Sequence, residues 1–423
     1  MPQSRAAARP TQDMTDAAPT SSAGFIEGAL KLKRLTLAQA VMLLVGGNVG
    51  AAILSLPYAA RVSGYPGAAL VSVLTTVFSV VSHLYIVEIM LRTKRPVQLV
   101  GLMREHMQEG GHAAAWVALM ALLTAGIAIP SLTAYVMGGA QIIDAFLPVG
   151  PVAAGLVFLI PGAAVVWLGL KATGVAQQWG SLLMGAALLT FALVSSARPE
   201  FDAARLARFV PGAMAAALPV GIFTSMSQAL VPEVVRGLSH APRQIPRAIM
   251  IGLAINLGFL LVFCAAIFGL QPFDAISEVV TVSWGRAFGV PIWVAVNSFA
   301  LLALLTSFWA SALAAMGNVI EALGFRSEAS FTSRLIAFAA TVAPSVVLVF
   351  MQRYDFGDMI SVAGAVGGVV LAVLPIPILL RARRRNERTP EFVCGPLFSP
   401  PVQVALVVFY VGALVYAALG SPH

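Results

Sequence analysis

The chain has 423 residues, of which 59% are hydrophobic and only 10% are charged. Soluble domains carry about 25% charged and about 45–50% apolar residues, so this composition excludes an ordinary soluble protein and indicates a polytopic membrane protein. The net charge of +8 therefore concerns orientation in the membrane, and no nucleic-acid partner is needed to explain it.

Residues 1–33 are rich in Ala, Ser, Thr and Pro and contain no apolar signal-peptide segment, so we expect a disordered cytoplasmic tail. Beyond the tail, eleven segments approach or exceed the length of about 20 apolar residues that a spanning helix needs. The third and eighth are long enough to predict strong tilt or extension beyond the membrane. The predicted all-α spans are 36–60, 66–91, 113–147, 151–170, 174–196, 213–238, 247–270, 284–321, 331–350, 358–380 and 401–419.

The first span is interrupted at mid-depth by Gly46, Gly47, Asn48 and Gly50. Irregular backbone at membrane depth is tolerated only where protein or a water-filled cavity satisfies it, and such breaks point to the substrate site of a transporter. Close helix packing is the alternative use of glycine in a membrane helix. The density of the cluster favours a secondary transporter over packing alone.

The sixth span is interrupted by the polar run from Thr224 to Gln228, between Pro219 and Pro232. The two interrupted spans are five apart, and so are the two long ones. This pattern predicts a five-plus-five inverted repeat with one added helix. The predicted units are a first repeat over 34–196, a second over 213–380, a basic cytoplasmic loop over 381–400, and an eleventh helix with a short external C-terminus over 401–423.

The distribution of Lys and Arg predicts the orientation. Twenty of the 26 basic residues fall on the segments that are cytoplasmic if the N-terminus is cytoplasmic. We therefore expect a multi-pass protein of the bacterial inner (plasma) membrane with an external C-terminus. The run from Arg381 to Arg385 predicts contact with anionic lipids.

Ionisable residues inside spans are functional candidates, and Glu88, Glu233 and Arg236 are predicted to form a cytoplasmic gate. Two readings of Glu88 stay open: a pair with Arg92 one turn along the helix, or a gate contact with Arg236 or Arg243. Glu233 and Arg236 are also spaced for a local pair. His83 is expected to be a hydrogen-bonded bundle residue, with a proton-relay role as its alternative.

The spans contain no HExxH, no GxSxG and no His/Glu cluster with metal-ligand spacing, so we predict no enzyme, no cofactor and no transition-metal site. Cys264 lies in an apolar segment and Cys394 in a basic loop, which argues against a structural disulfide. A transporter of another small organic solute and a non-transporting membrane sensor remain alternatives.

The run from Gly50 to Ala59, GAAILSLPYA, resembles the GAGILxLPYA signature of the amino acid/auxin permease family, near the bacterial aromatic amino acid (tryptophan/tyrosine) permeases. Thr306-Ser307-Phe308 is similar to the TSF of those permeases. Ala52 stands where the signature has its second glycine. The resemblance covers about residues 34–420 and implies the leucine-transporter fold, eleven helices, and import of neutral or aromatic amino acids by cation symport.

The resemblance also implies a binding site at the two breaks. Amides from Gly50, Ala51 and Ala52 would bind the substrate carboxylate, as expected of a half-helix N-terminus with unsatisfied donors and partial positive charge. Other implied contacts are the carbonyls near Gly46 and Gly47 and around Phe223 and Thr224, the side chains of Thr224, Ser225, Ser227 and Gln228, and an aromatic lid at Tyr135.

In sodium-coupled members of the fold, an ion lies between the first break and the eighth helix. The resemblance implies an all-oxygen site here, which suits a hard monovalent cation. Its ligands would be the carbonyls of Gly47, Val49 and Ala303 and the hydroxyls of Thr306 and Ser307. The absence of Lys, Arg and His from 174–196 favours sodium, whereas the resembling permeases are described as proton-driven. Back-bonding of the two hydroxyls within their own helix is the alternative.

Overall fold

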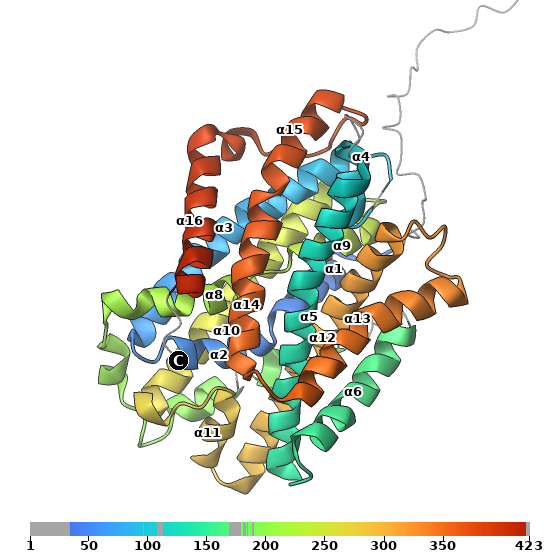
Figure 1. Ribbon diagram of the computed structural model, residues 1–423. Helices are drawn as coiled ribbons and strands as arrows, with labels where there is room; N and C mark the ends of the chain where they lie inside the picture. Colours follow the sequence, from blue (N-terminus) through green and yellow to red (C-terminus); the bar gives the residue numbers. More distant parts are fainter. Residues whose placement is uncertain are drawn as a thin grey trace, which may run out of the picture.

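The computed structural model describes residues 34–95, 97–107, 113–168, 179–180, 183, 185–187 and 190–419. The regular secondary structure of this part of the chain is all helical, with no strand (Figure 1). Its α-helices are α1 Leu37–Asn48, α2 Ala51–Ala59, α3 Gly64–Arg92, α4 Leu99–His106, α5 Ala113–Phe146, α6 Pro151–Leu168, α8 Met214–Thr224, α9 Val231–Gly237, α10 Ile245–Leu270, α11 Val280–Arg286, α12 Val290–Ala322, α13 Phe331–Met351, α14 Phe356–Gly368, α15 Pro375–Arg385 and α16 Pro400–Leu419.

Shorter turns complete the described backbone. Most are 3-10 turns in loops, and one π-helical turn joins α14 to α15 within a single span. They are η1 Ala203–Ala207, η2 Pro211–Ala213, η3 Gln228–Leu230, η4 Pro242–Gln244, η5 Phe273–Ala275, the π-turn η6 Val369–Val373 and η7 Gly395–Phe398.

Nine helices in the described ranges are long and apolar enough to cross a membrane. The pair α1 and α2, bent by 41° at its break, makes a tenth if it counts as one span. The predicted span over 174–196 is described only in part, because residues 174–178, 181–182, 184 and 188–189 lie outside the described residues, as does the whole predicted tail. The described chain thus accounts for up to ten of the eleven predicted spans.

The helices pack in two groups. The broken pairs α1–α2 and α8–α9 pack with α3 and α10, while α5, α6, α12 and α13 pack with one another. Helix α12 contacts α1 and α2 across the boundary, and α14 lies against both α5 and α8 (Figure 1). Both helix breaks therefore face the group that contains α5 and α12.

The predicted eighth span, 284–321, begins too early. Residues 280–286 form the separate helix α11, and α12 starts at Val290. Gly289 has φ +83°, in the left-handed region that glycine adopts without strain, and Pro291 follows in the first turn of α12. These two residues end one helix and start the next, which composition alone did not show.

The basic segment that was predicted as a loop from residue 381 begins as a helix. Helix α15 continues through Arg385 and ends where Asn386 takes a left-handed conformation with φ +43°. Arg381 to Arg385 thus form the last turns of a span that the hydropathy pattern ended too soon, because the charged residues concealed the helix.

Candidate functional site

The first break separates α1 from α2 at Val49 and Gly50. A Cβ atom on Gly50 would lie 1.9 Å from the Ser307 Oγ and 3.3 Å from the Ala303 carbonyl oxygen. Gly50 is therefore required by the close approach of α12 to the break. The sequence correctly placed this interruption, and the structure gives its packing reason.

Oxygen atoms gather at this contact. The Ser307 Oγ lies 3.4 Å from the carbonyl oxygen of Gly46 and 3.5 Å from that of Val49, and the Thr306 hydroxyl donates to the Ala303 carbonyl at 3.0 Å. Of the expected ion ligands, the structure places the Ser307 hydroxyl beside the Val49 carbonyl, whereas the Thr306 hydroxyl bonds back within its own helix, as the alternative interpretation has it. The carbonyl of Gly46, which the sequence did not select as an ion ligand, also faces Ser307, because Gly46 lies almost one helical turn before Val49 and on the same face.

The second break follows the end of α8 at Thr224, and helical backbone resumes at Gln228. The Thr224 carbonyl accepts a hydrogen bond from the Asn256 Nδ2 at 2.8 Å. The Ser225 carbonyl accepts one from the Ser79 Oγ at 2.6 Å. Side chains of α10 and α3 therefore already satisfy these two exposed carbonyls.

A cavity lies between the two breaks and helices α5 and α12. It holds about 700 Å³ of space that no atom fills, part of it open to solvent. Of the predicted residues, those lining it are Gly47, Ala51, Tyr135, Phe223, Ser227 and Ser307. Sequence reasoning did not select Asn48, Thr124, Ile127, Ser131, Met226, Ser311, Asn318 and Leu371, which also line it.

Some predicted site residues support the breaks instead. The Thr224 hydroxyl donates to the Gly221 carbonyl at 2.6 Å, and the Gln228 Nε2 donates to the Ser82 Oγ at 2.8 Å. Ser225 contributes its carbonyl to Ser79, as described above. These three side chains do not line the cavity, and the Ala52 side chain lies outside the described part of the structure.

Two aromatic residues face each other across the cavity wall. The Tyr135 Oη lies 3.4 Å from the Ser311 Oγ. The Tyr135 ring lies 6.3 Å from the ring of Phe223, measured between centroids. Tyr135 therefore stands where an aromatic lid was expected, between α5, α12 and the second broken helix.

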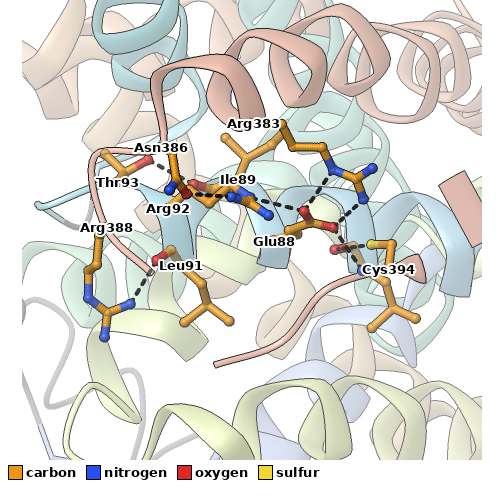
Figure 2. Close-up of polar contacts among 10 residues, drawn as sticks. Glu88, Ile89, Leu91, Arg92, Thr93, Arg383, Asn386, Arg388 and Cys394 are labelled. Atoms are coloured by element: carbon orange, nitrogen blue, oxygen red, sulfur yellow. Dashed lines mark hydrogen bonds and ion pairs between the residues drawn. The ribbon is translucent and has the colours of Figure 1, made fainter. Parts of the chain in front are cut away.

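Glu88 is fully buried near the end of α3 and is held by two arginines (Figure 2). Its carboxylate lies 3.0 Å from the Arg92 Nε and 2.8 Å from the Arg383 Nη2, and it accepts the backbone N–H of Cys394 at 2.8 Å. The local pair with Arg92 is confirmed. The alternative contact with Arg236 or Arg243 is wrong, because α15 packs along α3 and brings Arg383 to this carboxylate instead.

Hydrogen bonds in the same region hold the segment after α15 against the end of α3. The Arg92 Nη1 donates to the Asn386 Oδ1 at 2.8 Å, and the Arg388 Nη1 donates to the Leu91 carbonyl at 2.7 Å (Figure 2). Burial, reinforced by the neighbouring Glu88 carboxylate, raises the pKa of the Cys394 thiol. The thiol donates to the Leu84 carbonyl at 3.3 Å, so this cysteine is structural.

Glu233 and Arg236 form a second buried ion pair at the end of α9. The Arg236 Nη1 lies 2.9 Å from the Glu233 carboxylate, and its Nη2 lies 2.7 Å from Glu328, in the loop after α12. The Gln98 Nε2 also donates to Glu233, and the next residue, Leu99, lines the cavity. These contacts join the broken helix, α4 and the end of α12 over one side of the cavity.

Solved structures with this fold are transporters. MhsT in complex with L-phenylalanine has a TM-score of 0.66 at 15% identity, covering 92% of this chain and 100% of that one. Mhp1, a nucleobase-cation-symport-1 family transporter, has a TM-score of 0.59 at 12% identity, covering 96% and 97%. A manganese transporter of Eremococcus coleocola has a TM-score of 0.60 at 12% identity, covering 92% and 89%. At these identities the likeness concerns the fold, which is the leucine-transporter fold.

A search of curated proteins found no match. The model of the tryptophan/tyrosine permease family, in contrast, matches residues 33–417, which is nearly the whole chain. It includes both helix breaks and every residue that lines the cavity. This protein therefore belongs to the tryptophan/tyrosine permease family.

Proposed function

We propose that this permease imports an amino acid, neutral or aromatic, by cation symport, and that the cavity between the two helix breaks is the substrate site. The observation that carries the proposal is the start of α2 at the cavity wall, where Ala51 lies. A helix N-terminus presents unsatisfied N–H groups and partial positive charge, which suit a carboxylate.

The rest of the cavity fits an amino acid with an apolar side chain. Ile127, Phe223 and Leu371 line it with apolar surface, and Tyr135 and Ser311 add hydroxyl groups. In this proposal the amides of Gly50, Ala51 and Ala52 bind the carboxylate. The side chain of the substrate then lies against the apolar wall, and L-phenylalanine bound to a protein of this fold supports that chemistry.

The coupling ion is proposed to bind between the first break and α12. The carbonyls of Gly46, Val49 and Ala303 and the hydroxyls of Thr306 and Ser307 form a neutral oxygen cluster there. Hard monovalent cations prefer such ligands. Sodium is the ion we favour, and a proton is the alternative that the experiment below distinguishes.

The contacts between Glu233, Arg236 and Glu328 are proposed to act as the cytoplasmic gate. They cross from the broken helix to the loop after α12. Separating the partners of a buried ion pair leaves uncompensated buried charges, which is costly in free energy. Such contacts therefore suit an element with two discrete states. Glu88 would then hold the segment after α15 rather than gate the cavity.

The inverted repeats over 34–196 and 213–380 and a cytoplasmic N-terminus in the inner membrane complete the proposal. The bias of the basic residues supports this orientation. Reporter fusions after Arg388 and after His423 are expected on opposite sides of the membrane. Both on one side would contradict it. Of the proposed lipid contacts, the exposed Arg384 is best placed, because Arg383 binds Glu88.

The proposal is tested by reconstituting the protein into liposomes with labelled tryptophan, tyrosine, phenylalanine and leucine. A sodium gradient and a proton gradient are applied separately. We expect accumulation of at least one amino acid driven by an ion gradient. Binding without uptake would indicate a sensor, and uptake of none of the amino acids would indicate a different solute.

A further inference from the structure

A buried chain of hydrogen bonds runs from α3 to the cavity. The His83 Nε2 lies 2.9 Å from the Ser227 Oγ, and the Asn48 Nδ2 donates to the same Oγ at 3.0 Å. His83 is 0% exposed. Ser227 and Asn48 both line the cavity, so the chain links a buried imidazole to the first break through the second.

The direction of each hydrogen bond follows from the far end of the chain. The His83 Nδ1 lies 2.7 Å from the Ser79 carbonyl oxygen, which can only accept, so Nδ1 carries the hydrogen. In the neutral imidazole Nε2 is then an acceptor, and the Ser227 hydroxyl must donate to it. The Ser227 Oγ in turn accepts from the NH2 of Asn48. The Asn48 Oδ1 takes no part in this chain, and Asn48 is a residue of the cavity wall.

The surroundings of His83 favour its neutral form. Its partners are neutral groups of α3 and of the second break, and a buried charge without a partner is costly. Several charged or titratable groups near α3 are bonded to other residues. Arg383 of α15 binds Glu88, and Glu233 and Arg236 of α9 bind each other. The Tyr410 hydroxyl of α16 bonds Ser82.

We propose that Asn48 binds the ammonium group of the substrate through Oδ1, and that His83 and Ser227 are the positioning residues that hold the Asn48 amide in this orientation. The inference rests on the proposed amino-acid site. Asn48 ends α1, and the C-terminal end of a helix carries partial negative charge, which favours an ammonium group. The carboxylate at the start of α2 and the ammonium at the end of α1 would then bind the two sides of one break.

Protonation of His83 would reverse the chain. The Nε2–H would donate to the Ser227 Oγ. The Asn48 amide would then turn over, so that its Oδ1 accepts the Ser227 hydroxyl hydrogen and its NH2 faces the substrate ammonium. Two hydrogen-bond donors would then face each other. A protonated His83 would therefore oppose binding of an amino acid but not of an analogue that lacks the amino group, so the neutral imidazole is the form that suits the proposed site.

The experiment measures binding to the purified full-length protein by isothermal titration calorimetry. Two ligand pairs are used: L-tryptophan with indole-3-propionate, and L-phenylalanine with 3-phenylpropionate. Each analogue keeps the ring and carboxylate and lacks the amine. The variants are Asn48→Ala, Ser227→Ala and His83→Asn. The control Ser72→Ala removes a buried hydroxyl on α3 that donates to the Ala68 carbonyl within its own helix.

We expect each variant to weaken binding of the amino acid about tenfold, as loss of a hydrogen bond to a charged group does, and to change binding of the analogue by less than about twofold. The ratio of amino-acid affinity to analogue affinity should therefore fall in each of the three variants. Ser72→Ala should behave as the wild type does.

Equal weakening of amino acid and analogue in Asn48→Ala, or an unchanged preference in Ser227→Ala, overturns the inference while the proposed function stands. A wild type that binds neither tryptophan nor phenylalanine overturns the inference for aromatic substrates, and a wild type that binds and transports none of the four amino acids of the uptake panel overturns the proposed function as well. A variant that fails to fold is identified by its thermal unfolding. The ratio of amino-acid affinity to analogue affinity in the folded variants then decides, because a purely structural role of His83 would weaken binding of both ligands alike.

Discussion

The two broken helices differ in how the backbone carbonyls at their breaks find hydrogen-bond partners. At the second break, the carbonyls of Thr224 and Ser225 accept short hydrogen bonds from the side chains of Asn256 and Ser79. At the first break, the carbonyls of Gly46 and Val49 lie 3.4 and 3.5 Å from the Ser307 Oγ, which are long contacts among the described residues. A buried backbone group without a partner is costly. The two carbonyls of the second break are therefore already paired with side chains, whereas those of the first break are better placed to accept a ligand. Some buried side-chain atoms at the second break are unpaired in the described part of the chain, among them the Ser225 Oγ, the Gln228 Oε1 and the Asn256 Oδ1.

The same difference explains which types of residue occur at each break. The first break has glycines because α12 approaches closely, and a methyl group on Gly50 would overlap Ser307. The second break has polar side chains whose hydrogen bonds to α8 and α3 fix the shape of the backbone, as those of Thr224 and Gln228 do. Substitutions at the first break should therefore affect ligands most, and substitutions behind the second break should affect stability most.

The largest effect is expected for Gly50→Ala. Its Cβ would lie 1.9 Å from the Ser307 Oγ, and such overpacking costs about 1–3 kcal/mol or more. We expect uptake to be abolished and thermal unfolding to shift to lower temperature. Gly126→Ala is the matched control, because its Cβ meets open space and alanine favours the helix by roughly 0.5–1 kcal/mol.

A second variant decides whether the overlap is the cause. Gly50→Ala combined with Ser307→Gly removes the atoms that the new methyl group meets, so we expect stability to recover even though uptake does not. Normal uptake in Gly50→Ala alone would contradict the close approach of α12 to the break.

The next effect is expected behind the second break, for Asn256→Ala. Removing the amide leaves the Thr224 carbonyl buried and unpaired, which costs about 1–3 kcal/mol. We expect a lower unfolding temperature and substrate affinity within about twofold of the wild type. Asn297→Ala is the control, because Asn297 donates to the Trp293 carbonyl in its own helix. A large loss of affinity with unchanged stability would reverse the roles of the two breaks.

Both breaks could be predicted from the sequence because they depend on local chemistry. Clusters of glycine, or serine and threonine between prolines, are rare inside spans. The cavity walls on α5 and α12 could not be predicted in the same way. Ser131, for example, lines the cavity, but its hydroxyl donates to the Ile127 carbonyl of its own helix. The sequence does not distinguish it from a serine that makes the same bond and faces only protein.

Contacts that depend on how distant helices pack could not be predicted from the sequence either. Arg92 lies one turn from Glu88, so that pair follows from helical spacing. Arg383 is 295 positions from Glu88, and the pair forms only because α15 packs along α3. The reading of Glu88 as a gate failed for this reason. Charge and depth identified an important residue, but its partner depended on the fold.

The smallest effect concerns the oxygen cluster at the first break. If sodium binds there, Ser307→Ala removes one ligand and should raise the sodium concentration for half-maximal uptake several-fold, corresponding to about 1 kcal/mol. Thr306→Ala should act in the same direction. Ser311→Ala is the control, because Ser311 lies about one turn further along α12, lines the cavity and approaches Tyr135. It should alter the amino-acid dependence of uptake and leave the sodium dependence unchanged.

Unfolding provides a second measurement that does not depend on transport. A ligand at about 100 times its Kd stabilises the folded state by about 2.7 kcal/mol, so sodium should raise the unfolding temperature of the wild type more than that of Ser307→Ala. Potassium chloride at the same ionic strength separates this binding from screening. Full uptake without sodium that collapses with the pH gradient would assign coupling to protons. The oxygen atoms around Ser307 would then have the structural role that back-bonded hydroxyls have elsewhere in this protein.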